Sequence, residues 1–155
     1  MRRYELLKDV FYQNIEDQCF GIYKQKAYFH SIQVCTLCQI YASERQLDIE
    51  LASIIGLFHD YGQYIRHSSF QHAQISSEMT LKLLEDYDFY KQEKEIISKA
   101  IRLHSDKHRI DDDYSELIKD ADVMAKYYED PDYVFKEDER KRIEKMTKKP
   151  YSLNE

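Results

Sequence analysis

One segment of the chain is apolar on nearly every side if it is helical, and it constrains the fold more than any other. It runs from Leu51 to Phe58 and ends directly in the polar pair His59-Asp60. A helix without a polar face must be surrounded by other elements, so we predict a central helix from Asp48, its N-cap, to Asp60. A polar pair at its buried end costs free energy unless hydrogen bonds or a metal ion satisfy it.

The rest of the chain has the pattern of an all-α, single-domain helical bundle. Three Gly and two Pro in 155 residues are too few for the many tight turns of a β-sandwich. Apolar residues recur at helical intervals in further segments, which favours a bundle of about six or seven helices. Besides the central helix, we predict helices over 2–18, 26–45, 70–85, 91–104 and 114–129, and loops over 61–69 and 105–112.

The segment 136–149 differs from the rest because most of its side chains are charged. Only Ile143 and Met146 are apolar in it, so we predict a loosely packed helix or tail. We accordingly divide the chain into a helical domain over 1–135 and a charged C-terminal helix or tail over 136–155.

Charge balance and cysteine content restrict the partners and the compartment. With 29 acidic and 23 basic residues the net charge is −6, so no overall basic field attracts nucleic acid. We therefore expect a small-molecule substrate, no nucleic-acid partner and no membrane partner, since no apolar run approaches the roughly 20 residues of a membrane helix. Three cysteines and no N-terminal signal segment indicate a cytoplasmic protein. The sequence leaves the oligomeric state open, a homodimer included.

Further residues of metal-ligand type lie near the His59-Asp60 pair in the predicted fold. His30 precedes the pair near the start of the preceding helix, and two consecutive antiparallel helices can bring these positions together. Asp122 follows on the last long helix, within an apolar stretch. Two imidazoles and two carboxylates suit Mn, Fe, Co, Ni or Zn better than Ca or a structural zinc site. We predict that these four residues hold a divalent ion, Mg being another candidate.

A second ion is expected if two further histidines join the site. His72 and His104 are the candidates, with Asp60 as the bridging ligand and as the residue that orients the attacking water. Two ions a few ångströms apart activate water and hold both ends of a displacement at phosphorus. If only one ion binds, the two histidines are instead expected to contact the substrate or to transfer protons. We expect Asp120, two residues before Asp122, in solvent.

These motifs, taken in order, resemble the HD-domain superfamily of metal-dependent phosphohydrolases. The family pattern is a His, a His-Asp pair and a distant Asp on a helical bundle, and the likeness covers residues 25–130. It implies metal binding by His30, His59, Asp60 and Asp122, and hydrolysis of a small phosphate ester or nucleotide by metal-activated water. A bacterial subgroup shares four local signatures with the chain, here Phe58-His59-Asp60-Tyr61-Gly62, His72-Ala73, Ala100-Ile101-Arg102-Leu103-His104 and Asp120-Ala121-Asp122.

Two positions depart from the family pattern. Gln33 stands where the family often has Arg, and Gln63 where it often has Lys or Arg. Cations there are expected to hold substrate phosphate, so their absence weakens the case for a phosphate substrate but not for the metal. The basic residues that could compensate are Arg66, Lys107, Arg109 and Lys126, although we expect each of them at the surface. The candidates for substrate binding are Gln33, Gln63, Tyr61, Arg66 and Lys126.

Two other interpretations of the chain stay open. Some relatives of this fold carry a mixed-valent di-iron site and oxidise substrates with O₂, and the two absent cations are compatible with that class. The other alternative is a non-enzymatic helical binding module with a vestigial metal site. Cys35 and Cys38 form a Cys-x-x-Cys without a second pair or paired histidines, so we expect small buried residues there.

Overall fold

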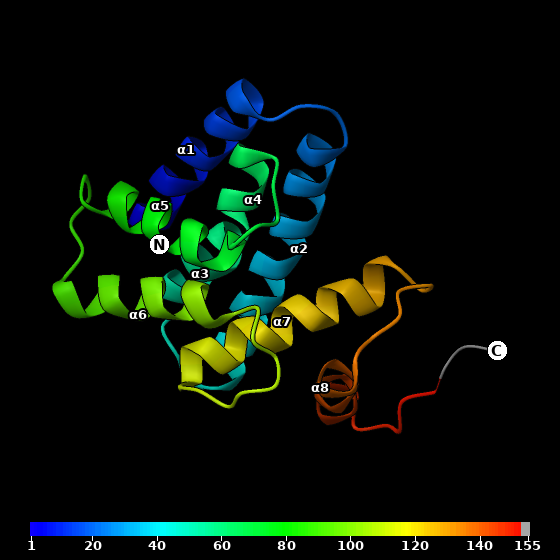
Figure 1. Ribbon diagram of the computed structural model, residues 1–155. Helices are drawn as coiled ribbons and strands as arrows, with labels where there is room; N and C mark the ends of the chain where they lie inside the picture. Colours follow the sequence, from blue (N-terminus) through cyan, green and yellow to red (C-terminus); the bar gives the residue numbers. More distant parts are fainter. Residues whose placement is uncertain (153–155) are drawn as a thin grey trace.

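Figure 1 shows the computed structural model of the chain, which describes residues 1–152. This part of the chain contains eight α-helices and no strand, so the predicted all-α class is confirmed. None of these helices combines the length and the apolar content needed to span a membrane. The helices are α1 (Arg2–Gln18), α2 (Gly21–Glu44), α3 (Ile49–Phe58), α4 (Tyr61–Arg66), α5 (His72–Leu84), α6 (Lys91–Leu103), α7 (Asp113–Glu129) and α8 (Glu137–Thr147).

Helix α3 lies at the centre of the bundle, as its apolar sequence predicts (Figure 1). Residues 51–58 are all buried, and α3 packs against α1, α2, α6 and α7. The Asp48 side chain caps the helix by accepting a hydrogen bond from the Leu51 amide at 3.0 Å. Gly56 allows close contact with α2, because a Cβ atom there would lie 2.8 Å from the Cys35 Cα atom. The end of α3 is therefore held in a fixed place.

The loop predicted over 61–69 is wrong for residues 61–66, which form α4. Gly62 lies so close to α5 that a Cβ atom on it would come within 2.8 Å of the Ser76 amide nitrogen. The Gly62 amide also donates a hydrogen bond to the Ser76 hydroxyl at 2.8 Å. This tertiary contact favours the helical turn, and a sequence pattern only a few residues long does not reveal it.

Helix α8 is well packed, which corrects the loose helix or tail predicted over 136–149. Ile143 is buried in the hydrophobic core, and α8 packs against α7. Arg142 is also buried, because carboxylates of α7 pair with it. Residues 153–155 of the predicted C-terminal segment lie outside the described residues, and the domain division at 135 stays a prediction.

Asp120 lies in the interface between α7 and α8 and not in solvent, which is a further correction. Its side chain is fully buried. From α8, Arg142 donates a hydrogen bond to it at 3.0 Å and Lys145 donates one at 2.8 Å. Arg45, which follows α2, donates a third at 2.8 Å. Burial alone would raise the pKa of Asp120, but these cations outweigh burial and lower it. Three cations from distant segments therefore make burial of this charge tolerable.

Replacing Gly56 with Ala tests the contact between α2 and α3. We expect Gly56→Ala to destabilise the fold by about 1–3 kcal/mol, because the new methyl group meets the α2 backbone. Helix propensity alone gives the opposite sign, a gain of about 1 kcal/mol. Urea unfolding measures the difference, with the exposed Thr36→Ala as the control on α2. A stabilised Gly56→Ala variant would contradict the close contact.

Candidate metal centre

The residues predicted as metal ligands come together where α3 ends. They are His30 from α2, His59 and Asp60 from the α3–α4 junction, and Asp122 from α7. All are buried, and one ligand atom of each lies within 4.8 Å of those of the others. The His30 Nε2 atom is 3.3 Å from His59 Nε2 and 3.0 Å from Asp122 Oδ1. Three separate segments of the sequence thus meet at one point.

A second group of side chains shares Asp60 with the first. Ligand atoms of Asp60, His72 and His104 also lie within 4.8 Å of one another. The Oδ1 atom of Asp60 is 3.3 Å from His72 Nε2 and 3.1 Å from His104 Nε2. Its Oδ2 atom is 3.2 Å from His59 Nε2. The two oxygens of one carboxylate therefore face two groups of histidines, an arrangement that suits a carboxylate bridging two ions.

His59 and His104 are oriented by their own helices. The Nδ1 atom of His59 lies 2.7 Å from the Gly56 carbonyl oxygen, three residues back, and His104 Nδ1 lies 2.7 Å from that of Ile101. A carbonyl oxygen only accepts, so both Nδ1 atoms carry the proton and donate. The Nε2 atom of each neutral imidazole then turns its lone pair toward the cluster, as metal-binding histidines do.

His72 and His30 are oriented in the same sense by other acceptors. His72 Nδ1 lies 3.1 Å from the Ser69 carbonyl oxygen. His30 Nδ1 lies 3.0 Å from both carboxylate oxygens of Glu129 at the end of α7. Outer partners of this kind fix the ring and raise the basicity of the opposite nitrogen. All four imidazoles therefore direct Nε2 inward.

The inward atoms form a set of acceptors that fits a divalent ion. When His30 and His59 are neutral, as metal binding requires, their Nε2 lone pairs lie 3.3 Å apart, beside the carboxylates of Asp60 and Asp122. Such a group is repulsive without a positive charge at its centre, and a cation removes the repulsion. Mixed nitrogen and oxygen donors suit first-row divalent metals.

The pKa values of the cluster indicate the same demand for positive charge. Burial would lower the pKa of His59, but the Asp60 and Asp122 carboxylates outweigh it and raise this pKa to about 10. Burial would raise the pKa of Asp60, yet His59 and His104 hold it well below its ordinary value. Burial dominates at His104 and lowers its pKa to about 4. The cluster therefore attracts either a proton on His59 or a metal ion.

Two lysines accompany Asp122 in the site. Lys107 donates to Asp122 Oδ2 at 2.7 Å and to the His104 carbonyl oxygen at 2.6 Å. Its side chain is only 9% exposed, so the expected surface position is wrong. The Asp122 carboxylate is the main cause that raises the pKa of Lys126. Lys107 and Lys126 therefore both belong to the lining of the site.

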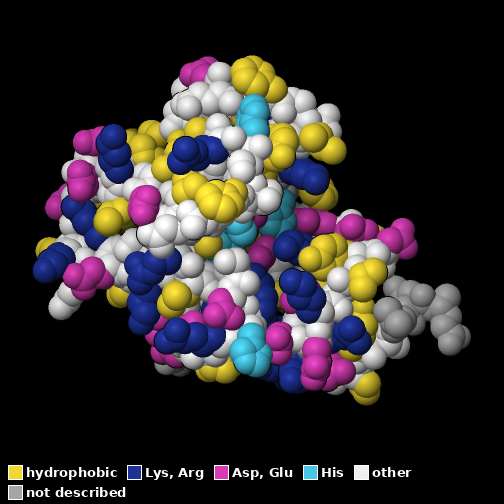
Figure 2. Space-filling view, viewed as in Figure 1, with side chains coloured by type: hydrophobic (Ala, Val, Ile, Leu, Met, Phe, Trp, Pro, Cys, Tyr) yellow, Lys and Arg dark blue, Asp and Glu magenta, His cyan; other side chains and the backbone are white. Residues whose placement is uncertain are grey.

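The cluster lies in a cleft with a volume of about 620 Å³. Figure 2 shows histidine side chains in a hollow near the middle of the molecule, with acidic and basic side chains beside them. Charged residues of both signs line this cleft, and its acidic residues are Asp60, Asp122, Glu129, Asp130 and Glu139. Its lysines are Lys26, Lys107, Lys126 and Lys136.

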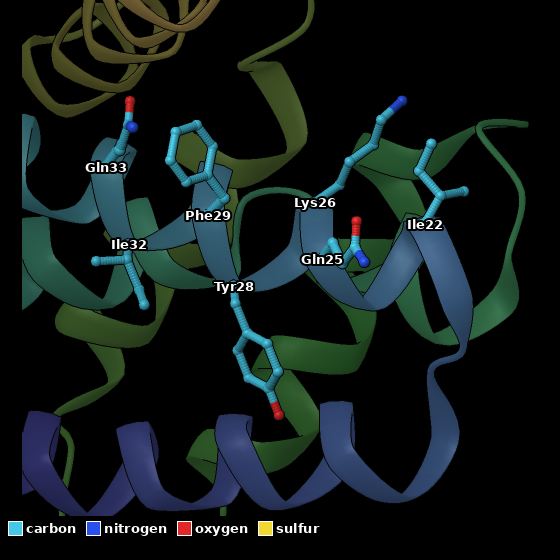
Figure 3. Close-up of a pocket in the computed structure, with 7 residues that line it drawn as sticks. All are labelled: Ile22, Gln25, Lys26, Tyr28, Phe29, Ile32 and Gln33. Carbon is cyan, nitrogen blue, oxygen red and sulfur yellow. The ribbon is translucent and has the colours of Figure 1, made fainter.

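The structure separates the five residues predicted for substrate binding. Gln63 and Lys126 line the cleft. Gln33 lines a groove on the outer side of α2, drawn in Figure 3. Arg66 lies at a different surface pocket. Tyr61 is buried in the core, where its hydroxyl accepts a hydrogen bond from the Asn14 amide at 2.7 Å.

The groove on α2 adjoins the cleft. It has a volume of about 790 Å³, and Lys26 and Phe29 line both cavities. Figure 3 shows Phe29 and Ile22 projecting from α2, whereas Tyr28 points toward α1. Phe29 and Ile22 leave 59% and 64% of their surfaces exposed. An apolar surface therefore adjoins the polar metal centre.

Sequence reasoning missed Glu129, the outer partner of His30. Asp122, Lys126 and Glu129 follow one another at intervals of four and three residues on α7. This spacing places all three on one face of a helix, so it was the available signal. Lys107 carries no such signal, because it lies in the segment between α6 and α7.

This fold and this cluster define the class of helical, metal-dependent phosphohydrolases. The family model described as HD domain matches residues 27–127, and the chain belongs to the HD-domain family. The resemblance predicted over 25–130 is therefore confirmed. No solved structure matches the chain.

Several curated relatives are proteins named Ribonuclease Y. The one from Geobacter sulfurreducens is 31% identical over 104 residues, which are 66% of this chain and 18% of the relative. The one from Protochlamydia amoebophila is 42% identical over 65 residues, 41% of this chain and 12% of the relative. Ribonuclease Y 1 of Pediococcus pentosaceus is 34% identical over 85 residues, covering 54% and 15%. The chain thus spans less than one fifth of the length of these relatives.

These relatives contradict the expected small-molecule substrate and the expected absence of a nucleic-acid partner, because they are named as ribonucleases. That expectation rested on the net charge of −6 for the whole chain. The net charge of a whole chain does not describe one site, and four lysines line this cleft together with five carboxylates. The whole-chain net charge was therefore the wrong quantity from which to exclude a nucleic-acid partner.

The charge on His59 predicts how stability depends on pH in protein freed of metal by a chelator. The pKa of His59 is about 10 in the folded chain against an ordinary value of 6.5. The stabilisation is therefore complete below about pH 6.5 and is lost as the pH rises toward 10. Melting temperatures over this range should fall more steeply for the wild type than for His59→Gln. Equal slopes would show that the carboxylates hold no proton on His59.

Proposed function

We propose that this chain is a divalent-metal-dependent hydrolase of phosphodiester bonds in RNA. One observation carries the proposal: two histidine groups converge on the shared Asp60 carboxylate in a cleft lined by lysines. Relatives named Ribonuclease Y support RNA as the substrate. The proposal concerns this chain alone, because it corresponds to less than one fifth of those relatives.

The proposed ligands of the first ion are His30, His59, Asp60 and Asp122. Asp60 also serves the second ion, together with His72 and His104. When bound, divalent ions supply a water of lowered pKa and neutralise charge on the phosphate. The inward Nε2 atoms and the two-sided contacts of Asp60 support this assignment.

The chain's own residues orient the reactants in this proposal. Asp60 accepts a hydrogen bond from the attacking water, because its carboxylate lies between the two histidine groups. Lys107 and Lys126 meet the negative phosphate from the side of Asp122. Gln63 lines the same cleft and offers an amide donor. In this proposal Lys107 and Lys126 supply the positive charge that the family pattern often has at the positions of Gln33 and Gln63.

The groove on α2 supports an extended substrate. It shares Lys26 and Phe29 with the cleft that contains the candidate metal ligands, so the two cavities adjoin. The exposed Phe29 ring suits stacking by a base of an unpaired strand, and Lys26 suits contact with a phosphate. A strand of RNA makes use of both features.

Metal content and RNA cleavage test the function together. We expect purified protein to bind Mn²⁺ in titration calorimetry and to cleave a single-stranded RNA oligonucleotide. His59→Ala should lower both the Mn²⁺ affinity and the rate of cleavage by more than about 100-fold, beyond the loss caused by removing an outer partner. His108→Ala is the matched control, since that side chain is 85% exposed.

Three results would count against this proposal. Cleavage that persists in excess chelator would show that no metal takes part in the reaction. Tightly bound iron with O₂-dependent turnover would favour the di-iron oxygenase class. Protein that binds no metal, and whose stability His59→Ala leaves unchanged, would favour a binding module.

A further inference from the structure

Helix α8 lies beyond the region matched by the HD-domain model, yet one of its side chains reaches the site's surroundings. Arg142 Nε and Nη2 donate to the Lys107 carbonyl oxygen at 3.1 and 3.0 Å. Its Nη2 atom also donates to the Arg109 carbonyl oxygen at 3.3 Å. One guanidinium therefore holds two carbonyl groups of the segment that joins α6 to α7.

The other side of the same guanidinium is fixed to α7. Arg142 Nη1 donates to Glu116 Oε1 at 2.9 Å and to Asp120 Oδ1 at 3.0 Å. The Arg142 side chain is only 5% exposed. Arginine suits this position because its planar group presents five donors at fixed angles, whereas a lysine ammonium has three and is compact.

The hydrogen bonds from Arg142 can fix the position of Lys107. Its backbone carbonyl is held by Arg142, and its ammonium is held by Asp122 Oδ2 at 2.7 Å and by the His104 carbonyl oxygen. Residues 104–112 join α6 to α7 and form no helix of their own. The position of the ammonium in the cleft therefore depends on contacts that fix this connecting backbone.

We propose that Arg142 is a positioning residue that holds Lys107 against Asp122 and keeps its ammonium in the cleft for the substrate phosphate. The role of Lys107 toward phosphate rests on the proposed function. The positioning of Lys107 by Arg142 rests only on the hydrogen bonds from α8 and α7. Helix α8, for which the sequence predicts a loosely packed helix or tail, thereby contributes to the geometry of the site.

Arg142→Lys is the informative variant. Arg142→Ala would leave the buried Asp120 and the partly buried Glu116 short of a cation and endanger folding. Arg142→Lys keeps a positive charge for them but cannot hold both carbonyl groups as well. Lys145→Gln is the matched control, because Lys145 also lies on α8 and pairs with Asp120. Melting temperatures verify that both variants fold.

Amide hydrogen exchange tests the positioning directly. We expect exchange in residues 104–112 to rise in Arg142→Lys and to stay at the wild-type level in Lys145→Gln. A role of Arg142 confined to docking α8 would raise exchange in α8 and leave 104–112 unchanged, and that result overturns the proposal. This measurement needs neither metal nor substrate.

A double-mutant cycle tests the link to phosphate. We expect Arg142→Lys and Lys107→Met each to weaken binding of inorganic phosphate to the Mn²⁺-loaded protein, by about tenfold for Lys107→Met. The double variant should bind as weakly as Lys107→Met alone, because Arg142 acts through Lys107. Additive losses overturn the proposal. If the wild type binds no phosphate, the proposed function fails, whereas the exchange experiment still decides whether Arg142 positions Lys107.

Discussion

The carboxylate of Asp60 is the interaction on which the rest of the site depends. One oxygen faces His59 and the other faces His72 and His104, so a single side chain joins residues from the end of α3, the start of α5 and the end of α6. Asp60 can do this because it follows a helix enclosed on all sides by other helices. Because α3 is packed on all sides, the Asp60 carboxylate that follows it has a fixed position. The other candidate ligands lie around this carboxylate.

Helix α7 carries two buried carboxylates, which lie on opposite sides of the helix and pair with different groups. Asp122 faces His30 and Lys107 in the cleft, whereas Asp120 faces Arg142 and other cations at α8. Two residues on a helix diverge by about 200°, so the pair in Asp-Ala-Asp must point to opposite sides. Each carboxylate is buried, and each has a positive partner of its own. Loss of either set of partners would leave a buried charge uncompensated.

Much of the fold and of the site could be predicted because the relevant residues lie in helices with clear apolar faces. The central place of α3 and the convergence of His30, His59 and Asp122 follow from such faces. Asp120 was misjudged because its neighbour Lys119 suggested solvent, although both side chains are fully buried in ion pairs. Pairing between charges far apart in the chain leaves no periodic signal.

The sequence by itself determined the helical class, the position of the apolar core helix and the identity of the residues that converge beside it. These follow from local periodicity and from the chemistry of histidine and carboxylate side chains. Only the tertiary structure decided that Lys107 belongs to the site, that Tyr61 belongs to the core and that α8 is packed. The reason is physical: where a charged or aromatic side chain comes to lie depends on partners from distant segments, and only folding brings those partners together.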